Sequence, residues 1–133
     1  MANTIEEVFY SVLSADAPVI ALVGTKIYPA ILPEDVNYPS IVFARTGSEG
    51  FSCLGTDLKI GRATMNVVTL STSIATAGSI GRAVRTALTA IHGDYTNVQV
   101  KQVDLESGPR SDYDATLDVH MSVMDFSVIY EDL

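Results

Sequence analysis

Cysteine and basic residues are scarce in this sequence, and each shortage argues against a class of protein. Cys53 is the single cysteine among 133 residues, so no internal disulfide can form and we expect folding in a reducing compartment. Basic residues are scarce too: eight lysines and arginines stand against sixteen aspartates and glutamates, giving a formal net charge of −8. An acidic chain of this kind lacks the excess of basic residues that nucleic-acid-binding proteins carry. Its charge also disfavours binding to an anionic membrane surface.

Long apolar runs are also missing. The run from Pro18 to Val23 is far shorter than the roughly 20 residues that a membrane-spanning helix needs. The first residues, Met1-Ala2-Asn3-Thr4-Ile5-Glu6-Glu7, place no basic region before an apolar one, so we expect no secretory signal peptide. Hydrophobic residues nevertheless make up 47% of the chain and charged residues 18%. This composition predicts a single folded domain over residues 1–133.

Three helices are signalled. Thr4 and Glu7 form a capping-box pattern before an apolar stripe at helical spacing, made of Ile5, Val8, Phe9, Val12 and Leu13. Asp16 predicts the start of a short second helix over residues 17–23. One of residues 71–73 is expected to cap a longer helix that runs to about residue 91.

Two glycines stand out in that longer helix. Gly78 and Gly81 lower its intrinsic helix propensity, and close packing against a sheet is the expected compensation. Arg82 and Arg85 fall on the outer side of the same helix.

Four strands are expected, over residues 40–46 and 62–70 and then twice between residue 98 and the C-terminus. Val103 and Leu105 stand one step out of register with the preceding valines, which predicts a bulge, and a turn is expected over residues 107–112. From Tyr113 apolar and polar residues alternate strictly to Val123, which predicts one wholly polar strand face. The apolar positions change parity after Asp125, and one extra residue near Met124 and Asp125 would explain the change.

The order of these elements predicts an α+β fold: a four-stranded, mainly antiparallel sheet with two main helices packed on one face. Residues 47–61 interrupt the pattern with four glycines, and we expect a long loop or a flexible hairpin there. Four apolar residues fall in this segment, and they could pack onto their own domain or dock on a neighbouring subunit. These candidate interface residues are Phe51, Leu54, Leu58 and Ile60.

A search for chemistry finds nothing specific. His92 and His120 lack metal-ligand spacing, and His120 beside Asp118 fits a solvated strand face. Three aspartates could gather a divalent ion but match no calcium-binding loop: Asp112, Asp114 and Asp118. No phosphate-binding GxxxxGK[ST] loop is present. We therefore expect no catalytic residue, no cofactor, no metal site and no enzymatic activity.

The first third of the chain carries family-like segments. It reads Leu13-Ser14-Ala15-Asp16-Ala17-Pro18-Val19-Ile20-Ala21-Leu22-Val23-Gly24, then Lys26-Ile27-Tyr28-Pro29, Leu32-Pro33 and Tyr38-Pro39-Ser40-Ile41-Val42-Phe43. This order resembles the opening of the small tail completion (tail terminator, or tail-to-head joining) proteins of tailed bacteriophages, with their "VxxLVGxRIYP" segment, proline spacer and "PYIVF"-like strand. Lys26 replaces the usual arginine, and Ser40 stands where an aromatic residue often sits. The later elements agree in layout.

The resemblance implies a structural virion protein. Such proteins cap the head-proximal end of the tail tube as a ring, usually a hexamer, stop tube polymerisation and join tail to head. The implied partners are other copies of the chain, the tail tube protein and a neck or head-completion protein. DNA would pass through an acidic channel without specific binding, and no membrane would be involved. The implied location is the tail–head junction of the virion, after synthesis in the host cytoplasm.

Two other functions remain open on the sequence. One is another head–tail connector, or neck, protein. The other is a dimeric α+β module that binds a small ligand between sheets.

Overall fold

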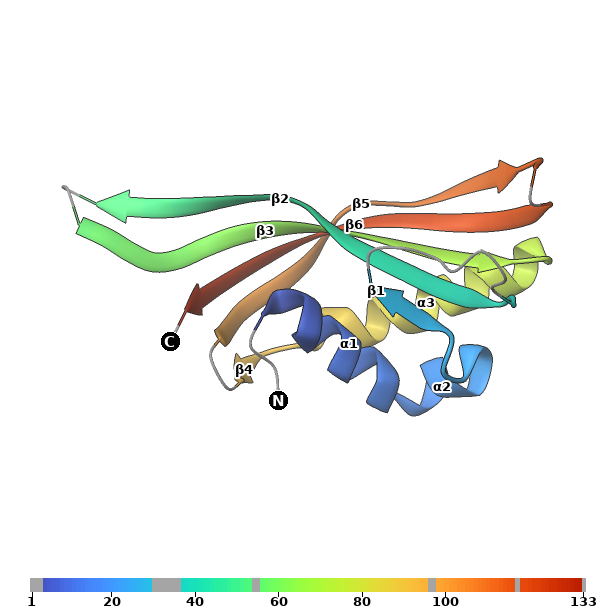
Figure 1. The fold of residues 1–133 in the computed structure, drawn as a ribbon, viewed down its shortest axis with the longest axis horizontal. Helices are drawn as coiled ribbons and strands as arrows, with labels where there is room; N and C mark the ends of the chain where they lie inside the picture. The colour runs from blue at the N-terminus through green and yellow to red at the C-terminus, as the bar shows by residue number, and fades with distance from the viewer. Residues whose placement is uncertain (1–3, 30–36, 54–55, 96–97, 117, 133) are drawn as a thin grey trace.

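A computed structural model of the chain describes residues 4–29, 37–53, 56–95, 98–116 and 118–132, with the backbone alone for residues 48–59 and 132. The elements are α1 (Ile5–Ala15), α2 (Ala17–Val23), β1 (Ile27–Pro29), β2 (Ser40–Cys53), β3 (Thr56–Ser71), α3 (Ile74–Thr89), β4 (Gly93–Asp94), β5 (Val98–Asp114) and β6 (Val119–Asp132). They form one sheet in the order β1-β2-β3-β6-β5-β4. The helices gather on one side of this strongly twisted sheet (Figure 1).

The α+β class is confirmed, but the expectation of four strands is wrong: the described sheet has six. The additional strands are three and two residues long. β1 pairs parallel with β2, and β4 pairs antiparallel with β5 at the opposite edge. Such short strands carry no periodicity of their own, and they exist because a longer strand lies beside them.

The helix starts lie where the sequence placed them. The backbone N–H of Glu7 donates to Thr4 Oγ1 at 3.2 Å, and that of Val19 donates to Asp16 Oδ2 at 3.3 Å. Ser73 is the residue that caps α3. Each cap satisfies a backbone donor that the first helical turn leaves unpaired.

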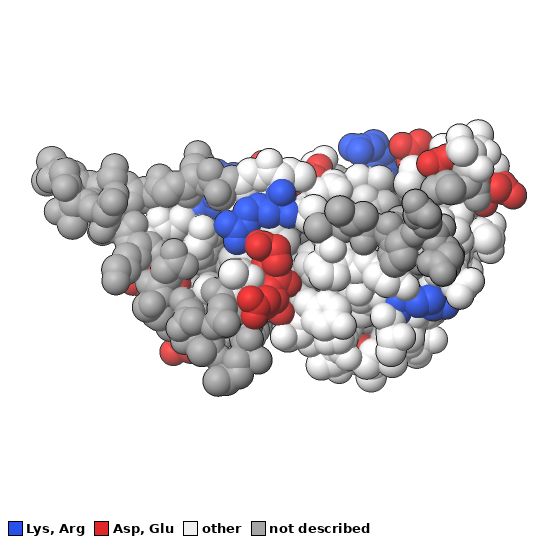
Figure 2. Space-filling view, in the orientation of Figure 1, with Lys and Arg blue, Asp and Glu red and all other residues white. Residues whose placement is uncertain are grey.

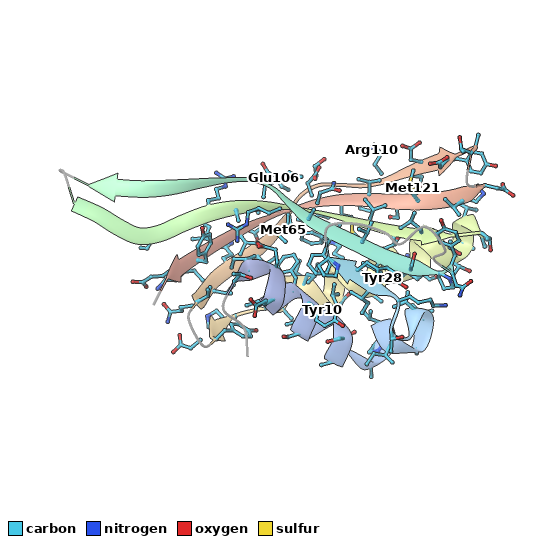
Figure 3. The ribbon with its side chains drawn as sticks, in the orientation of Figure 1. Tyr10, Tyr28, Met65, Glu106, Arg110 and Met121 are labelled. Atoms are coloured by element: carbon cyan, nitrogen blue, oxygen red, sulfur yellow. The ribbon has the colours of Figure 1, made fainter. Side chains whose placement is uncertain are left out.

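The core lies between the helices and the middle of the sheet. Phe9 of α1 packs against Phe43 of β2 and Phe126 of β6, with ring centroids 6.2 and 6.5 Å apart. Met65 of β3 is fully buried here, whereas Tyr10 is half exposed on the outer side of α1 (Figure 3). The aromatic cluster therefore joins α1 to β2 and β6, the two strands on either side of β3.

The last strand differs from its predicted form. β6 pairs with β3 in continuous register from Ile60 to Ser71, so no extra residue lies near Met124. Instead, both faces of β6 bury apolar residues: Met124 joins the core under the helices, while Val123, opposite Val68, is buried on the other face. The predicted polar face is not solvated at Ser122, which is 6% exposed and lies beneath α3.

The strand before it also differs. The predicted turn over residues 107–112 is wrong, because β5 continues to Asp114 and the turn comes after it, before β6 begins. The predicted irregularity is present: register shifts follow Val100 and Leu105, and a further one precedes Arg110. The Gly108-Pro109 pair therefore lies at a register shift within β5 and does not end the strand.

The two glycines of α3 have different surroundings. A Cβ on Gly81 would lie 2.9 Å from Ser122 Oγ and 3.4 Å from Ser122 Cβ, so the predicted close packing against the sheet is confirmed there. Gly78 is exposed, and a Cβ on it would meet nothing within 4 Å. Packing among the described residues therefore does not explain Gly78.

This difference predicts opposite outcomes for two alanine substitutions. Gly78→Ala should raise the free energy of unfolding by about 0.5–1 kcal/mol, because it adds helix propensity in open space. Gly81→Ala should leave the protein roughly 1–3 kcal/mol less stable than Gly78→Ala, because Ser122 must move to admit the methyl group. Urea unfolding of both variants measures this. Equal gains would show that α3 does not need its close approach to β6.

Candidate interaction surfaces

The segment predicted as a long loop or a flexible hairpin is a hairpin, with register shifts between Arg45 and Gly47 and between Gly50 and Ser52. β2 and β3 stay paired as far as Cys53 and Thr56, whereas β6 accompanies β3 only as far as Ile60. The projecting part extends past the helices at one end of the molecule (Figure 1). We call residues 47–61 the arm, of which the part beyond Gly50 and Ile60 leaves the sheet. The hairpin alternative of the sequence prediction is therefore confirmed.

The candidate interface residues map onto this arm, but the structure describes little of them. Leu54 lies outside the described residues, and the side chains of Phe51 and Leu58 are likewise not described. Ile60 is partly exposed at the base of the arm, opposite Glu131. Their role as an interface remains a prediction.

An ion pair anchors the strand that leads into the arm. Arg45 Nε donates to Glu6 Oε1 at 2.8 Å, and Arg45 Nη2 lies 2.6 Å from the same oxygen. The guanidinium carbon also lies 5.9 Å from the ring centroid of Tyr130. The strand that leads into the arm is thus tied both to α1 and to β6.

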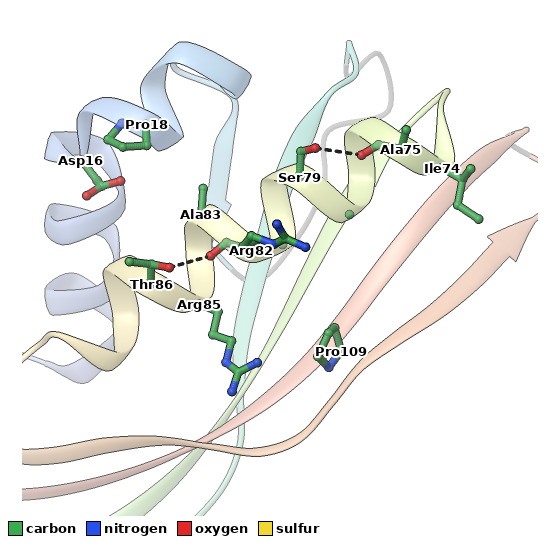
Figure 4. A pocket seen from close by; sticks show the side chains of 12 residues that line it. Asp16, Pro18, Ile74, Ala75, Ser79, Arg82, Ala83, Arg85, Thr86 and Pro109 are labelled. Carbon is green, nitrogen blue, oxygen red and sulfur yellow. Dashed lines mark hydrogen bonds between the residues drawn. The ribbon is translucent and has the colours of Figure 1, made fainter.

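A hollow of about 790 Å³ lies over the outer side of α3. Its walls come from α3, from the junction of α1 and α2, and from β5 (Figure 4). The lining is largely small or apolar, with Ile74 60% exposed. Arg82 and Arg85 project from the same helix into this region, and neither forms an ion pair within the described part of the chain.

Sequence reasoning placed Arg82 and Arg85 on the outer side of α3 but missed the hollow. Its walls include Asp16, Ile74 and Pro109, which are too far apart in the sequence for any local pattern to join. The available signal was a pair of glycines inside the helix, Gly78 and Gly81, which both line the hollow, whereas the exposure of Ile74 is visible only in the structure.

The end of the β5–β6 hairpin gathers the polar candidates. Tyr113 donates its hydroxyl to Asp118 Oδ1 at 2.5 Å and its ring lies 4.9 Å from that of His120. The hydrogen bond to Asp118 is the main cause that raises the pKa of the exposed Tyr113 phenol, and the charge of Asp114 adds to it. Among the described residues no group of three or more His, Cys, Asp or Glu side chains could hold a metal ion.

Charges are distributed in small groups over the surface. On the face drawn in Figure 2, Lys and Arg stand apart from one another, mostly beside acidic side chains. Among the residues that the structure describes, ion pairs join Arg45 to Glu6, Arg62 to Glu106 at 3.9 Å, and Lys101 to Glu131 at 3.3 Å. No helix in the described part is long and apolar enough to cross a bilayer.

The Tyr113–Asp118 contact predicts a specific titration. Asp118→Asn should lower the pKa of one of the six tyrosines, because it removes the carboxylate whose hydrogen bond and charge disfavour tyrosinate. Ultraviolet absorbance of tyrosinate as the pH is raised measures the change, with Tyr113→Phe identifying the residue. Asp104→Asn is the control and should leave the curve unchanged. An unchanged curve for Asp118→Asn would contradict the assignment.

Comparison with solved structures gives two informative matches. A chain of the virion of a native gene transfer agent (GTA) particle superposes with a TM-score of 0.81 at 19% identity, covering 96% of this chain and 94% of that one. The gp17 protein of bacteriophage SPP1 superposes with a TM-score of 0.55 at 17% identity, covering 92% and 86%. At these identities the matches establish a shared fold.

Sequence comparison identifies the family. No curated protein sequence matches the chain. The family described as "Tail completion protein gp17" matches residues 7–131, which is nearly the whole chain. The chain therefore belongs to the tail completion protein gp17 family, whose members are structural proteins of phage tails and not enzymes.

Proposed function

We propose that this protein caps the head-proximal end of a phage tail tube as a hexameric ring, stops tube polymerisation there and joins the tail to the head. The observation that carries the proposal is the family match over residues 7–131. Its partners are then the tail tube protein on one side of the ring and a neck or head-completion protein on the other. The protein would reside at the tail–head junction of the virion after synthesis in the host cytoplasm.

The arm is one reason to propose a ring. A ring of identical subunits is closed by heterologous contacts, which need two different surfaces on each copy. A two-stranded hairpin that leaves its sheet is at best marginally stable in water, so the arm gains most by packing on a neighbour. Its residues Phe51, Leu54 and Leu58, with Ile60 at its base, supply the apolar surface for that contact.

The charge distribution supports passive passage of DNA through the ring. The chain carries a net charge of −8, and Arg45, Arg62 and Lys101 are held by carboxylates. A channel lined by such a surface repels the phosphate backbone and leaves DNA free to move. An assembled ring with a positively charged channel would contradict this part of the proposal.

The decisive test uses purified tail tubes. The tubes are incubated with this protein, then offered fresh tube subunits and imaged by electron microscopy. We expect six-fold rings at one end of each tube and no growth from that end. Tubes that keep growing without a seated ring would contradict capping and favour a neck connector, or the dimeric ligand-binding module if the protein is a dimer in solution.

Substitutions in the arm test its part in capping. Phe51→Ser combined with Leu58→Ser should reduce the fraction of capped tubes at least tenfold, because the arm loses apolar surface that the ring contact buries. Ile20→Ser is the matched control: Ile20 is 42% exposed on α2, away from the arm, and its loss should leave capping intact. Circular dichroism checks that both variants fold. Normal capping by the arm variant would exclude these residues from the interface.

A further inference from the structure

We propose that the hollow over α3 receives the arm of a second copy of this chain. The arm and the hollow would then be the two halves of the contact between neighbouring subunits. This inference rests on the ring proposed above and adds the surface that each arm occupies.

The positions of the two features favour a contact between copies. The arm projects from one end of the sheet, while α3 begins at the other end and the hollow lies along it (Figures 1 and 4). The arm therefore does not reach the hollow of its own chain. A contact from one end of a copy to the other end of the next is heterologous, which is the kind that closes rings.

The two surfaces match in polarity. Ile74 is 60% exposed, more than any other large hydrophobic side chain described, and Pro18 and Pro109 extend the apolar lining around it. The arm contributes Phe51 and Leu58 to such a contact. Covering the exposed Ile74 with apolar residues of the arm favours association, because apolar surface is then removed from water.

Their charges also complement one another. Arg82 and Arg85 outnumber Asp16 in the lining of the hollow, and Asp16 already accepts a hydrogen bond as a helix cap. The arm carries Glu49 and Asp57 against Lys59. A net positive surface thus faces a net negative one, which orients the partners and fixes their register.

Gly78 gives an independent indication. An exposed glycine inside a helix costs helix propensity relative to alanine, and no contact within the described chain requires one at this position. Gly78 lines the hollow. The close approach of a neighbour's backbone accounts for the missing side chain, since glycine is the residue that permits such an approach.

The acidic end of the β5–β6 hairpin is the rival occupant. It offers three aspartates, but its exposed aromatic ring, that of Tyr113, is already bonded to Asp118. It also lies near the same end of the molecule as the start of α3 (Figure 1). The arm offers more apolar surface and the opposite placement, so we favour it.

The native cysteine provides the test, because Cys53 stands at the end of β2 in the arm. Ser79 lines the hollow and is exposed, and Ser79→Cys is nearly isosteric. Rings of this variant seated on tube ends are oxidised and run on a non-reducing gel. We expect loss of the monomer band and a ladder that extends to the hexamer and collapses on reduction. Ser14→Cys, exposed on α1 outside the hollow, is the control and should stay monomeric.

The possible results distinguish a wrong placement of the arm from a failure of the proposed ring. Seated rings of the Ser79→Cys variant without a disulfide ladder would overturn the placement of the arm and leave capping standing. A ladder from Ser79→Cys with Ser111→Cys in a Cys53→Ser background would also overturn it, in favour of the β5–β6 hairpin. A ladder that stops at the dimer would indicate a reciprocal pair and overturn the head-to-tail contact. The absence of any ring would refute the proposed function, and the inference with it.

Discussion

The packing of Phe9 against Phe43 and Phe126 holds a short helix layer on a long sheet, and the rest of the architecture follows from that mismatch. α3 and β3 both contain sixteen residues. A helix rises about 1.5 Å per residue and a strand about 3.3 Å, so α3 spans about 24 Å and β3 about 53 Å. The helices therefore cover only part of the length of the sheet (Figure 1). The arm extends past them at one end, and at the other end the outer half of β5 stays exposed.

Overhanging strands expose backbone groups that invite uncontrolled pairing, and the two ends handle this differently. Beyond β4, the edge strand β5 carries charged side chains, register shifts and Pro109, each of which opposes the addition of another strand. The arm carries apolar residues and ends in a two-stranded hairpin. The edge of β5 thus resists pairing with a strand of another molecule, whereas the arm gains stability by packing on one. Together these features favour one defined contact between copies over open-ended aggregation.

Local signals in the sequence predicted the elements whose causes are local. Thr4, Asp16 and Ser73 mark helix starts because a cap involves residues within one turn, and the order of the long elements follows from periodicity. β1 and β4 escaped prediction because their existence depends on β2 and β5. The Gly108-Pro109 pair is a strong turn signal, yet pairing with β6 carries the strand through it. The actual turn includes Asp118, which adopts a φ of 54°, a conformation that aspartate tolerates better than most residues.

The interaction surfaces lay at the limit of what the sequence could predict, and α3 illustrates why. Gly78 and Gly81 are indistinguishable in sequence, since both lower helix propensity and both suggest close packing. Only the three-dimensional arrangement separates them, because Gly81 faces Ser122 and Gly78 faces open space. The glycine costs about 1 kcal/mol of helix stability, and no contact among the described residues offsets this cost, which favours a contact with another molecule. In a protein whose family acts by assembly, such an unexplained local cost is evidence about the interface.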